Sequence, residues 1–63
     1  MKSREVISIL EAAGWRLDRI KGSHHHFRHP KRPGTVTVSH PESDFAIGTL
    51  KSIEKQSGVD LRK

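Results

Sequence analysis

The 63-residue sequence contains no cysteine and no long apolar run. The absence of cysteine excludes disulfide bonds and zinc sites with thiolate ligands, so the core must form without such staples. This composition is typical of a reducing compartment, and we expect a cytoplasmic protein. A membrane-spanning helix needs roughly 20 apolar residues and a secretory signal needs an apolar segment near its start, and the sequence has neither. We therefore expect a soluble protein that has no membrane partner.

Acidic residues are also scarce. Seven Asp and Glu residues stand against twelve Lys and Arg residues, and the formal net charge at pH 7 is +5. Such a basic chain favours a polyanionic partner such as nucleic acid, although an acidic protein or plain solvation would satisfy the charge equally well. A chain of this length buries only about 60% of the surface that its unfolded form exposes. We expect residues 1–63 to form one small domain.

Two segments carry apolar residues at helical spacing. The first predicts a helix over residues 3–13, with Ser3 as its N-cap and Gly14 as the residue that ends it. The second predicts a helix that begins near residues 47–49 and ends before Gly58. Its candidate N-caps are Asp44 and Thr49, and its expected inward-facing residues are Ile47, Leu50 and Ile53.

Three segments between the helices alternate apolar and polar residues, which is the period-two pattern of a β-strand. They are Trp15–Ile20, His24–His29 and Thr35–Ser39, joined by turns at 21–23 and 30–34. Trp15 and Leu17 are expected to face the core, where Trp15 packs rather than stacks on a nucleic-acid base. The simplest packing of this order places both helices on one face of a three-stranded antiparallel sheet, an α+β fold that resembles the double-stranded RNA-binding domain. Residues 60–63 are expected to form a polar tail.

The most informative stretch is Gly22-Ser23-His24-His25-His26-Phe27, in which a glycine turn leads three histidines onto a predicted strand. Burial of a phenylalanine stabilises a fold by about 1.5–3 kcal/mol, so we expect Phe27 to face inward together with His25. Alternation then places His24, His26 and Arg28 on the opposite, solvent-facing side. Neutral imidazole accepts a proton near physiological pH, and protonated imidazole donates one or holds a phosphate. This side is therefore a candidate site for chemistry on nucleic acid.

The remaining histidines and the possibility of a metal site need separate treatment. His29 is expected to be a solvated turn residue, whereas His40 is either structural or part of the site. His24 and His26 share a strand face and could in principle bind zinc or nickel, but two ligands without cysteine or a well-placed carboxylate make a poor site. We expect no metal and no cofactor.

Four short motifs occur in a fixed order along the chain. They are Gly14-Trp15, Gly22-Ser23-His24, Val38-Ser39-His40-Pro41 and Gly48-Thr49-Leu50. This ordered set, which extends from about residue 3 to residue 58, resembles the HicA toxin family. The resemblance implies a double-stranded RNA-binding-like fold, mRNA interferase activity and neutralisation by a HicB-type antitoxin in a bacterial or phage toxin–antitoxin pair. The family's catalytic histidine follows Gly-Ser or Gly-Thr, which implies His24; Ser39 departs from the proline that family members often carry there.

A mechanism can be stated from the chemistry of RNA itself. The 2′-hydroxyl attacks the adjacent phosphorus once a base removes its proton, and an imidazole in the role of general base or acid contributes about 10²- to 10⁴-fold in rate. One histidine does not supply both base and acid in one step, so the partner of His24 is His26, a lysine or water. Backbone approach at a glycine, a hydroxyl donor and nearby cations would hold the phosphate. The candidate RNA-binding residues are Lys21, Gly22, Ser23, His26, Arg28, Lys31 and Arg32.

Two other functions fit the same sequence. The first is an RNA-binding module of the same fold that has no catalytic activity. The second is an adaptor whose basic face binds an acidic protein. A His24→Ala change separates the nuclease from the binding module, because it abolishes cleavage in a nuclease and only weakens affinity in a binding module.

Overall fold

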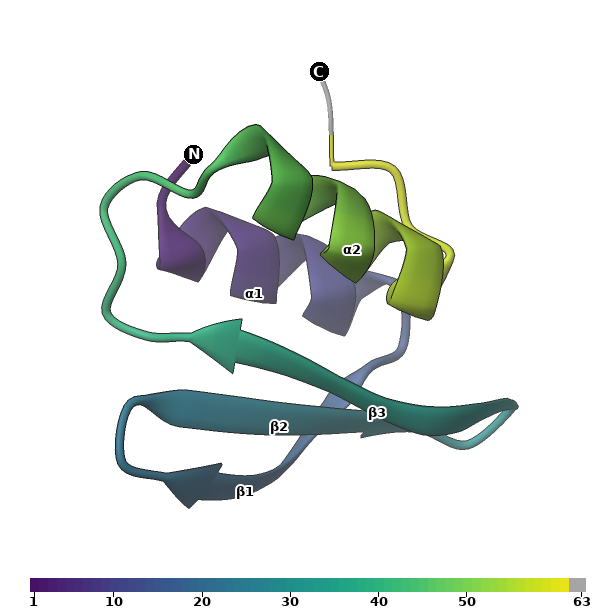
Figure 1. The fold of residues 1–63 in the computed structure, drawn as a ribbon. Coiled ribbons are helices and arrows are strands. Elements are labelled where there is room, and N and C mark those ends of the chain that lie inside the picture. Colours follow the sequence, from purple (N-terminus) through teal and green to yellow (C-terminus); the bar gives the residue numbers. More distant parts are fainter. Residues whose placement is uncertain (62–63) are drawn as a thin grey trace.

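The computed structural model describes residues 1–61 as two helices and three strands (Figure 1). In chain order these are α1 (Ser3–Ala12), β1 (Arg16–Lys21), β2 (His24–His29), β3 (Arg32–Ser39) and α2 (Ile47–Ser57). Both helices lie on one face of the sheet, and no described segment covers the opposite face. The predicted α+β class and the order of the elements are confirmed. No helix among residues 1–61 is long and apolar enough to cross a membrane.

The sheet is an antiparallel meander with the strand order β1-β2-β3. In the central strand, His24 lies opposite Lys21 of β1 and Ser39 of β3. Directly opposite residues project from the same face of a sheet, so one register assigns the faces of all three strands. A bulge between Leu17 and Arg19 shifts the pairing of β1 with β2.

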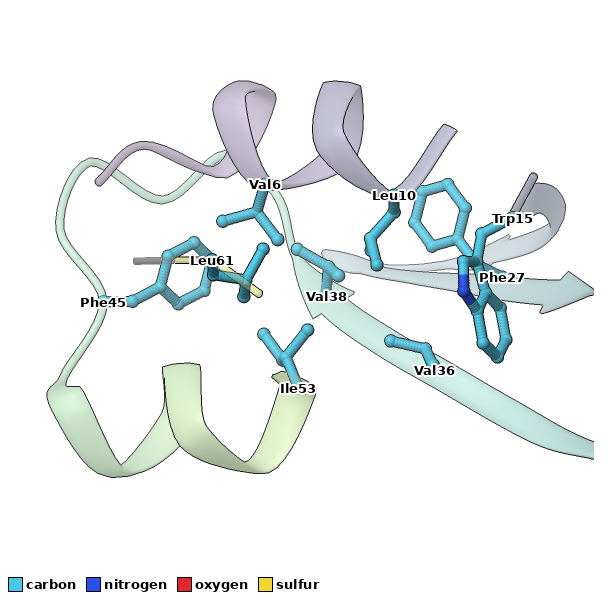
Figure 2. Close-up of a cluster of buried hydrophobic side chains, with 9 residues drawn as sticks. All are labelled: Val6, Leu10, Trp15, Phe27, Val36, Val38, Phe45, Ile53 and Leu61. Carbon is cyan, nitrogen blue, oxygen red and sulfur yellow. The ribbon is translucent and has the colours of Figure 1, made fainter. Parts of the chain in front are cut away.

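The core fills the space between the helices and the sheet (Figure 2). Trp15 and Phe27 are both buried, which confirms that each faces inward. The other buried apolar residues are Val6, Leu10, Val36, Val38, Phe45, Ile53 and Leu61. Because these residues come from both helices, from β2 and β3, and from the segments before and after α2, their packing holds the sheet in a fixed orientation under the helices.

The prediction that β1 is half-buried is wrong. All six of its residues are exposed, and Leu17 retains 47% of its accessible surface although it lies opposite the buried Phe27. The helices contact β3, and β1 is the edge strand farthest from it. A period-two pattern shows which side chains share a face, but it does not show whether another element covers that face.

The N-terminus of α1 also differs from the prediction. Lys2 occupies the N-cap position, and Ser3 lies inside the first turn with its side chain buried. The Lys2 backbone N–H donates to Glu5 Oε1 at 2.8 Å. The Ser3 hydroxyl is engaged by a distant part of the chain, because the Glu42 N–H donates to Ser3 Oγ at 2.9 Å. Ser3 is therefore a tertiary contact rather than a helix cap.

The second helix is confirmed at its C-terminus and corrected at its start. Gly58 adopts a left-handed conformation, with φ 72°, and its N–H donates to the Glu54 carbonyl at 2.8 Å, as expected of a residue that ends a helix. Ala46 occupies the N-cap position, so neither Asp44 nor Thr49 caps the helix. Ile47, predicted to face inward, is exposed.

Two further boundaries depend on tertiary contacts. The third strand begins at Arg32 rather than at residue 35, so it includes part of the predicted turn. The predicted polar tail contains Leu61, which is 1% exposed and lies in the core, and whose N–H donates to Glu54 Oε2 at 2.8 Å. Residues 62 and 63 lie outside the described residues.

Candidate functional site

The candidate site is the sheet surface that faces away from the helices, which we call the open sheet face. Because Phe27 points into the core, alternation along β2 sends its even-numbered neighbours outward, and the register assigns the residues opposite them to the same side. The open sheet face consists of Arg16, Arg19 and Lys21 from β1, His24, His26 and Arg28 from β2, and Thr37 and Ser39 from β3. It therefore joins imidazole, hydroxyl and cationic groups on one surface.

His24 is the first residue of β2 and is exposed, as the sequence predicts. The turn before it places Gly22 in a left-handed conformation with φ 60°, which glycine adopts without the steric cost that a side chain incurs. Nothing lies within 4 Å of the position that a Cβ would occupy at Gly22, so the backbone there is open to an approaching group. The exposed Ser23 adds a hydroxyl beside it. The turn thus presents His24 to a ligand with little obstruction.

His26 shares the open sheet face with His24 and is half-buried. The two ring centroids lie 6.4 Å apart, with the ring planes at 67°. His26 Nδ1 and Thr37 Oγ1 form a hydrogen bond of 2.9 Å across the pair of strands, which holds the His26 ring in one orientation. Thr37 was not among the predicted site residues, because its partnership with His26 arises only from the register of β2 and β3.

Cations surround the two imidazoles. Lys21 lies opposite His24, Arg19 lies opposite His26, and Arg28 lies opposite Arg16 at the other end of the pair of strands. Arg19 forms an exposed ion pair of 3.8 Å with Asp18, which solvent screens. Like charges directly opposite one another destabilise a sheet, and a bound polyanion relieves that repulsion. Arg16 and Arg19 were absent from the predicted site. Strict alternation from the inward-facing Leu17 would place Arg19 and Lys21 on the helix side, and only the bulge between Leu17 and Arg19 brings them to the face of Arg16.

Two predicted RNA-binding residues lie elsewhere. His24 begins β2, whereas Lys31 follows the other end of that strand, in the turn that leads to β3. Arg32 lies opposite His29 on the helix side of the sheet, and its guanidinium approaches the end of α2, where a Cβ added at Gly58 would lie 2.8 Å from Arg32 Cζ. A cation at a helix C-terminus interacts favourably with the helix dipole. The structure therefore does not bring Lys31 or Arg32 together with His24.

His25 and His40 form a second pair on the helix side of the sheet. Their ring centroids are 4.9 Å apart, edge to face. His40 Nδ1 shares a hydrogen bond of 2.6 Å with Ser3 Oγ, and the His40 backbone N–H donates to the Ser23 carbonyl at 2.7 Å. His40 therefore ties the start of α1 to the turn that precedes His24. These contacts are structural, and His40 does not lie on the open sheet face.

His29 corrects a prediction, because it is not a solvated turn residue. Its ring lies edge-on to Trp15 with centroids 5.2 Å apart. Its Nδ1 accepts the Lys31 N–H at 3.0 Å, which leaves Nε2 to donate to the Ala13 carbonyl at 3.0 Å. The ring covers Gly14, where an added Cβ would lie 2.7 Å from His29 Nε2. This close approach explains why a glycine precedes the tryptophan.

No metal centre is evident in the described part of the chain. Among residues 1–61 no three histidine, aspartate or glutamate side chains are grouped as metal ligands would be. His24 and His26 present two imidazoles to solvent, and their neighbours across the strands are cations and a hydroxyl. A site of this composition favours an anion over a cation.

The fold and the open sheet face define a small basic α+β domain with two helices on one face of a three-stranded antiparallel sheet. The family model described as HicA toxin of bacterial toxin-antitoxin matches residues 3–59. The chain belongs to the HicA toxin family and is a toxin of the toxin–antitoxin class. It is also similar to a chain of the solved structure described as the HicA3 and HicB3 toxin-antitoxin complex, with 32% identity and a TM-score of 0.83 over 98% of this chain and 100% of that one. A comparison with curated proteins finds no match.

Proposed function

We propose that this toxin is an endoribonuclease that cleaves mRNA, an mRNA interferase, with His24 as its catalytic base. The observation that carries the proposal is the position of His24, exposed on a basic sheet face that no described element covers. Membership of the HicA family supports a toxic activity. The charge of the open sheet face supports RNA as the substrate, because a polyphosphate is the anion that several cations in a row bind best.

The RNA lies across the open sheet face in this proposal. Lys21 and Arg19 contact phosphates on either side of the reacting group, and Arg28 extends the basic surface along β2. The open backbone at Gly22 and the Ser23 hydroxyl approach the phosphate next to His24, where a hydroxyl donor stabilises the charge that grows during the reaction. Each phosphate contact releases counterions, so binding weakens as the salt concentration rises.

The reaction uses the nucleophile that RNA carries. His24 removes the proton of the 2′-hydroxyl, the 2′-oxygen forms a bond to phosphorus, and the bond from phosphorus to the 5′-oxygen breaks as that oxygen takes up a proton. The products are a 2′,3′-cyclic phosphate and a 5′-hydroxyl. The step is a transesterification and consumes no water. Proton transfer by a positioned imidazole contributes about 10²- to 10⁴-fold in rate. No metal ion takes part in this scheme.

A HicB-type antitoxin is the proposed protein partner. The similar solved structure is described as a toxin–antitoxin complex, which supports a partner of that kind. Covering the open sheet face would remove His24 from the substrate and neutralise the surrounding cations. Amide exchange with and without antitoxin tests this, and we expect protection at residues 22–28. Protection confined to α1 and α2 would contradict the proposed mode of inhibition.

The test of the activity compares the wild type with His24→Ala and His24→Gln on a labelled mRNA in the presence of EDTA. We expect cleavage to 2′,3′-cyclic phosphate ends by the wild type and loss of cleavage in both variants. Gln56→Ala, a change on the exposed side of α2, serves as the control and should cleave like the wild type. RNA binding without cleavage by all four proteins would replace the proposal with a non-catalytic RNA-binding module.

A further inference from the structure

The open sheet face carries a second imidazole whose function the scheme above leaves unassigned. Cleavage needs a group that gives a proton to the 5′-oxygen while His24 removes one from the 2′-hydroxyl. Imidazole is suited to both tasks because its charge changes near physiological pH. His25, His29 and His40 lie on the helix side of the sheet and contact His40, Trp15 and His25 respectively. His26 is thus the histidine that shares the face of His24.

The separation of the two rings suits one phosphodiester. Their centroids are 6.4 Å apart. A catalytic acid or base acts over a heavy-atom distance of about 2.6–3.2 Å, so a group held between the rings can be within reach of both imidazoles. The ring planes meet at 67°, so the two imidazoles are not stacked face to face.

Thr37 prepares His26 for this task. A hydroxyl both donates and accepts, so Thr37 Oγ1 bonds to His26 Nδ1 whether that nitrogen carries a proton or not. When the ring is protonated, Nδ1–H donates to Thr37 Oγ1 and Nε2–H is left to serve the substrate. The bond keeps the ring in place as the proton on Nε2 comes and goes. His24, which is more exposed, is left to approach the 2′-hydroxyl.

We propose that His26 is the general acid of the reaction and that Thr37 is its positioning residue; this rests on the proposed endoribonuclease function. As His24 takes the 2′-hydroxyl proton and the 2′-oxygen bonds to phosphorus, His26 Nε2–H donates its proton to the departing 5′-oxygen. The reaction leaves His24 protonated and His26 neutral, and exchange with solvent restores both. No oxidant, reductant or added water is consumed in the step.

Replacement of the leaving atom tests the role of His26. The assay uses an RNA oligonucleotide with the natural 5′-oxygen at the cut position and a second one with sulfur there. A thiol has an unperturbed pKa of about 8.5 and departs as a thiolate without help from an acid. We expect His26→Ala to lose about 10²- to 10⁴-fold on the oxygen substrate and less than about tenfold on the sulfur substrate. His24→Ala should lose activity on both.

The pH profile and the Thr37 variants complete the test. A general acid must start protonated, so the wild-type rate should fall at alkaline pH, and His26→Ala should lose that alkaline limb. Thr37→Val removes the hydroxyl and should lower the rate on the oxygen substrate, whereas Thr37→Ser keeps the hydroxyl and should restore it. A loss from folding alone would show in circular dichroism and would affect both substrates equally.

The outcomes separate this inference from the proposed function. Equal cleavage by the wild type and His26→Ala would show that His26 is incidental while the endoribonuclease stands. An equal loss on the oxygen and sulfur substrates by a folded His26→Ala would show that it does not act as the acid. Failure of the wild type to cut either substrate would overturn the endoribonuclease proposal itself, and this inference with it.

Discussion

The contact between Ser3 and His40 makes a prediction that links the stability of the fold to the position of His24. Ser3 is 2% exposed, and its hydroxyl has two partners from the end of the sheet: His40 Nδ1 at 2.6 Å and the Glu42 N–H at 2.9 Å. Ser3→Ala removes the hydroxyl, so His40 Nδ1 and the Glu42 N–H each lose their hydrogen bond to it. His40 in turn holds the Ser23 carbonyl at 2.7 Å, one residue before His24.

The expected cost follows from the number of groups that lose a partner. A buried polar group left unsatisfied costs about 1–3 kcal/mol, and both groups here are only partly buried, so we expect a loss of about 2–3 kcal/mol in the free energy of unfolding. At about 0.05–0.15 kcal/mol per residue, the whole domain has about 3–9 kcal/mol. With an m-value of about 1 kcal/mol per molar urea, the unfolding midpoint should fall by about 2–3 M.

The assay is urea unfolding followed by the fluorescence of Trp15, the single tryptophan, which is buried in the core. Ser8→Ala, an exposed serine on the same helix, is the matched control and should change stability by less than about 0.5 kcal/mol. A double-mutant cycle of Ser3→Ala with His40→Ala should give a coupling energy of about 0.5–3 kcal/mol. Additivity of the two changes within about 0.5 kcal/mol would refute the reasoning, since an ordinary helix cap would act independently of His40.

Two further pairs of variants test the placement of the arginines on the sheet and the contact between Gly14 and His29. Arg19→Ala should weaken binding of a 2′-O-methylated RNA, which lacks the nucleophile, and reduce the slope of log affinity against log salt by about 0.7; Arg32→Ala should leave the slope unchanged, because its guanidinium lies beside Gly58. An equal reduction of the slope in both variants, measured by fluorescence anisotropy, would contradict this placement. Gly14→Ala should destabilise the fold by about 1–3 kcal/mol more than Gly34→Ala: both residues have a positive φ, but the added Cβ meets the His29 ring only at Gly14. Equal melting temperatures for the two variants would show that the His29 contact is unimportant.

The histidines divide into two groups by the face of the sheet they occupy. His24 and His26 lie on the open sheet face, where they are available to a ligand. The other three are engaged in ring contacts or hydrogen bonds on the helix side, and they hold the N-terminus of α1 and the loop at Gly14 in place. Alternation along β2 thus separates the candidate catalytic histidines His24 and His26 from His25 and His29, and His40 joins the second group from the end of β3.

Local signals predicted the elements and the direction of His24. The helical spacing of apolar residues, the Gly58 stop signal and the alternation around Phe27 are all short-range patterns, and the structure confirms the elements that they predict. The outward direction of His24 follows because burying Phe27 is favourable and neighbouring strand residues face opposite sides. The motif Gly22-Ser23-His24 pointed to the candidate site for the same reason, since its features lie within a few residues.

The errors arose where a position depends on a distant part of the chain. Ser3 has the composition of a helix cap, but its partners lie at residues 40 and 42. Leu17 has the alternation of a half-buried strand, but the helices leave β1 uncovered. Leu61 follows a helix stop signal and a polar residue, yet it packs into the core.

The class of the fold, the order of its elements, the basic character of the chain and the outward direction of His24 all follow from local sequence. Backbone periodicity and the burial of large apolar side chains act over a few residues. The identity of the residues that surround His24 depends instead on tertiary contacts. The pairing register placed Lys21, Arg19 and Thr37 beside the imidazoles, and helix packing left that side of the sheet open. Register and coverage result from contacts between segments far apart in the chain, which no short window of sequence records.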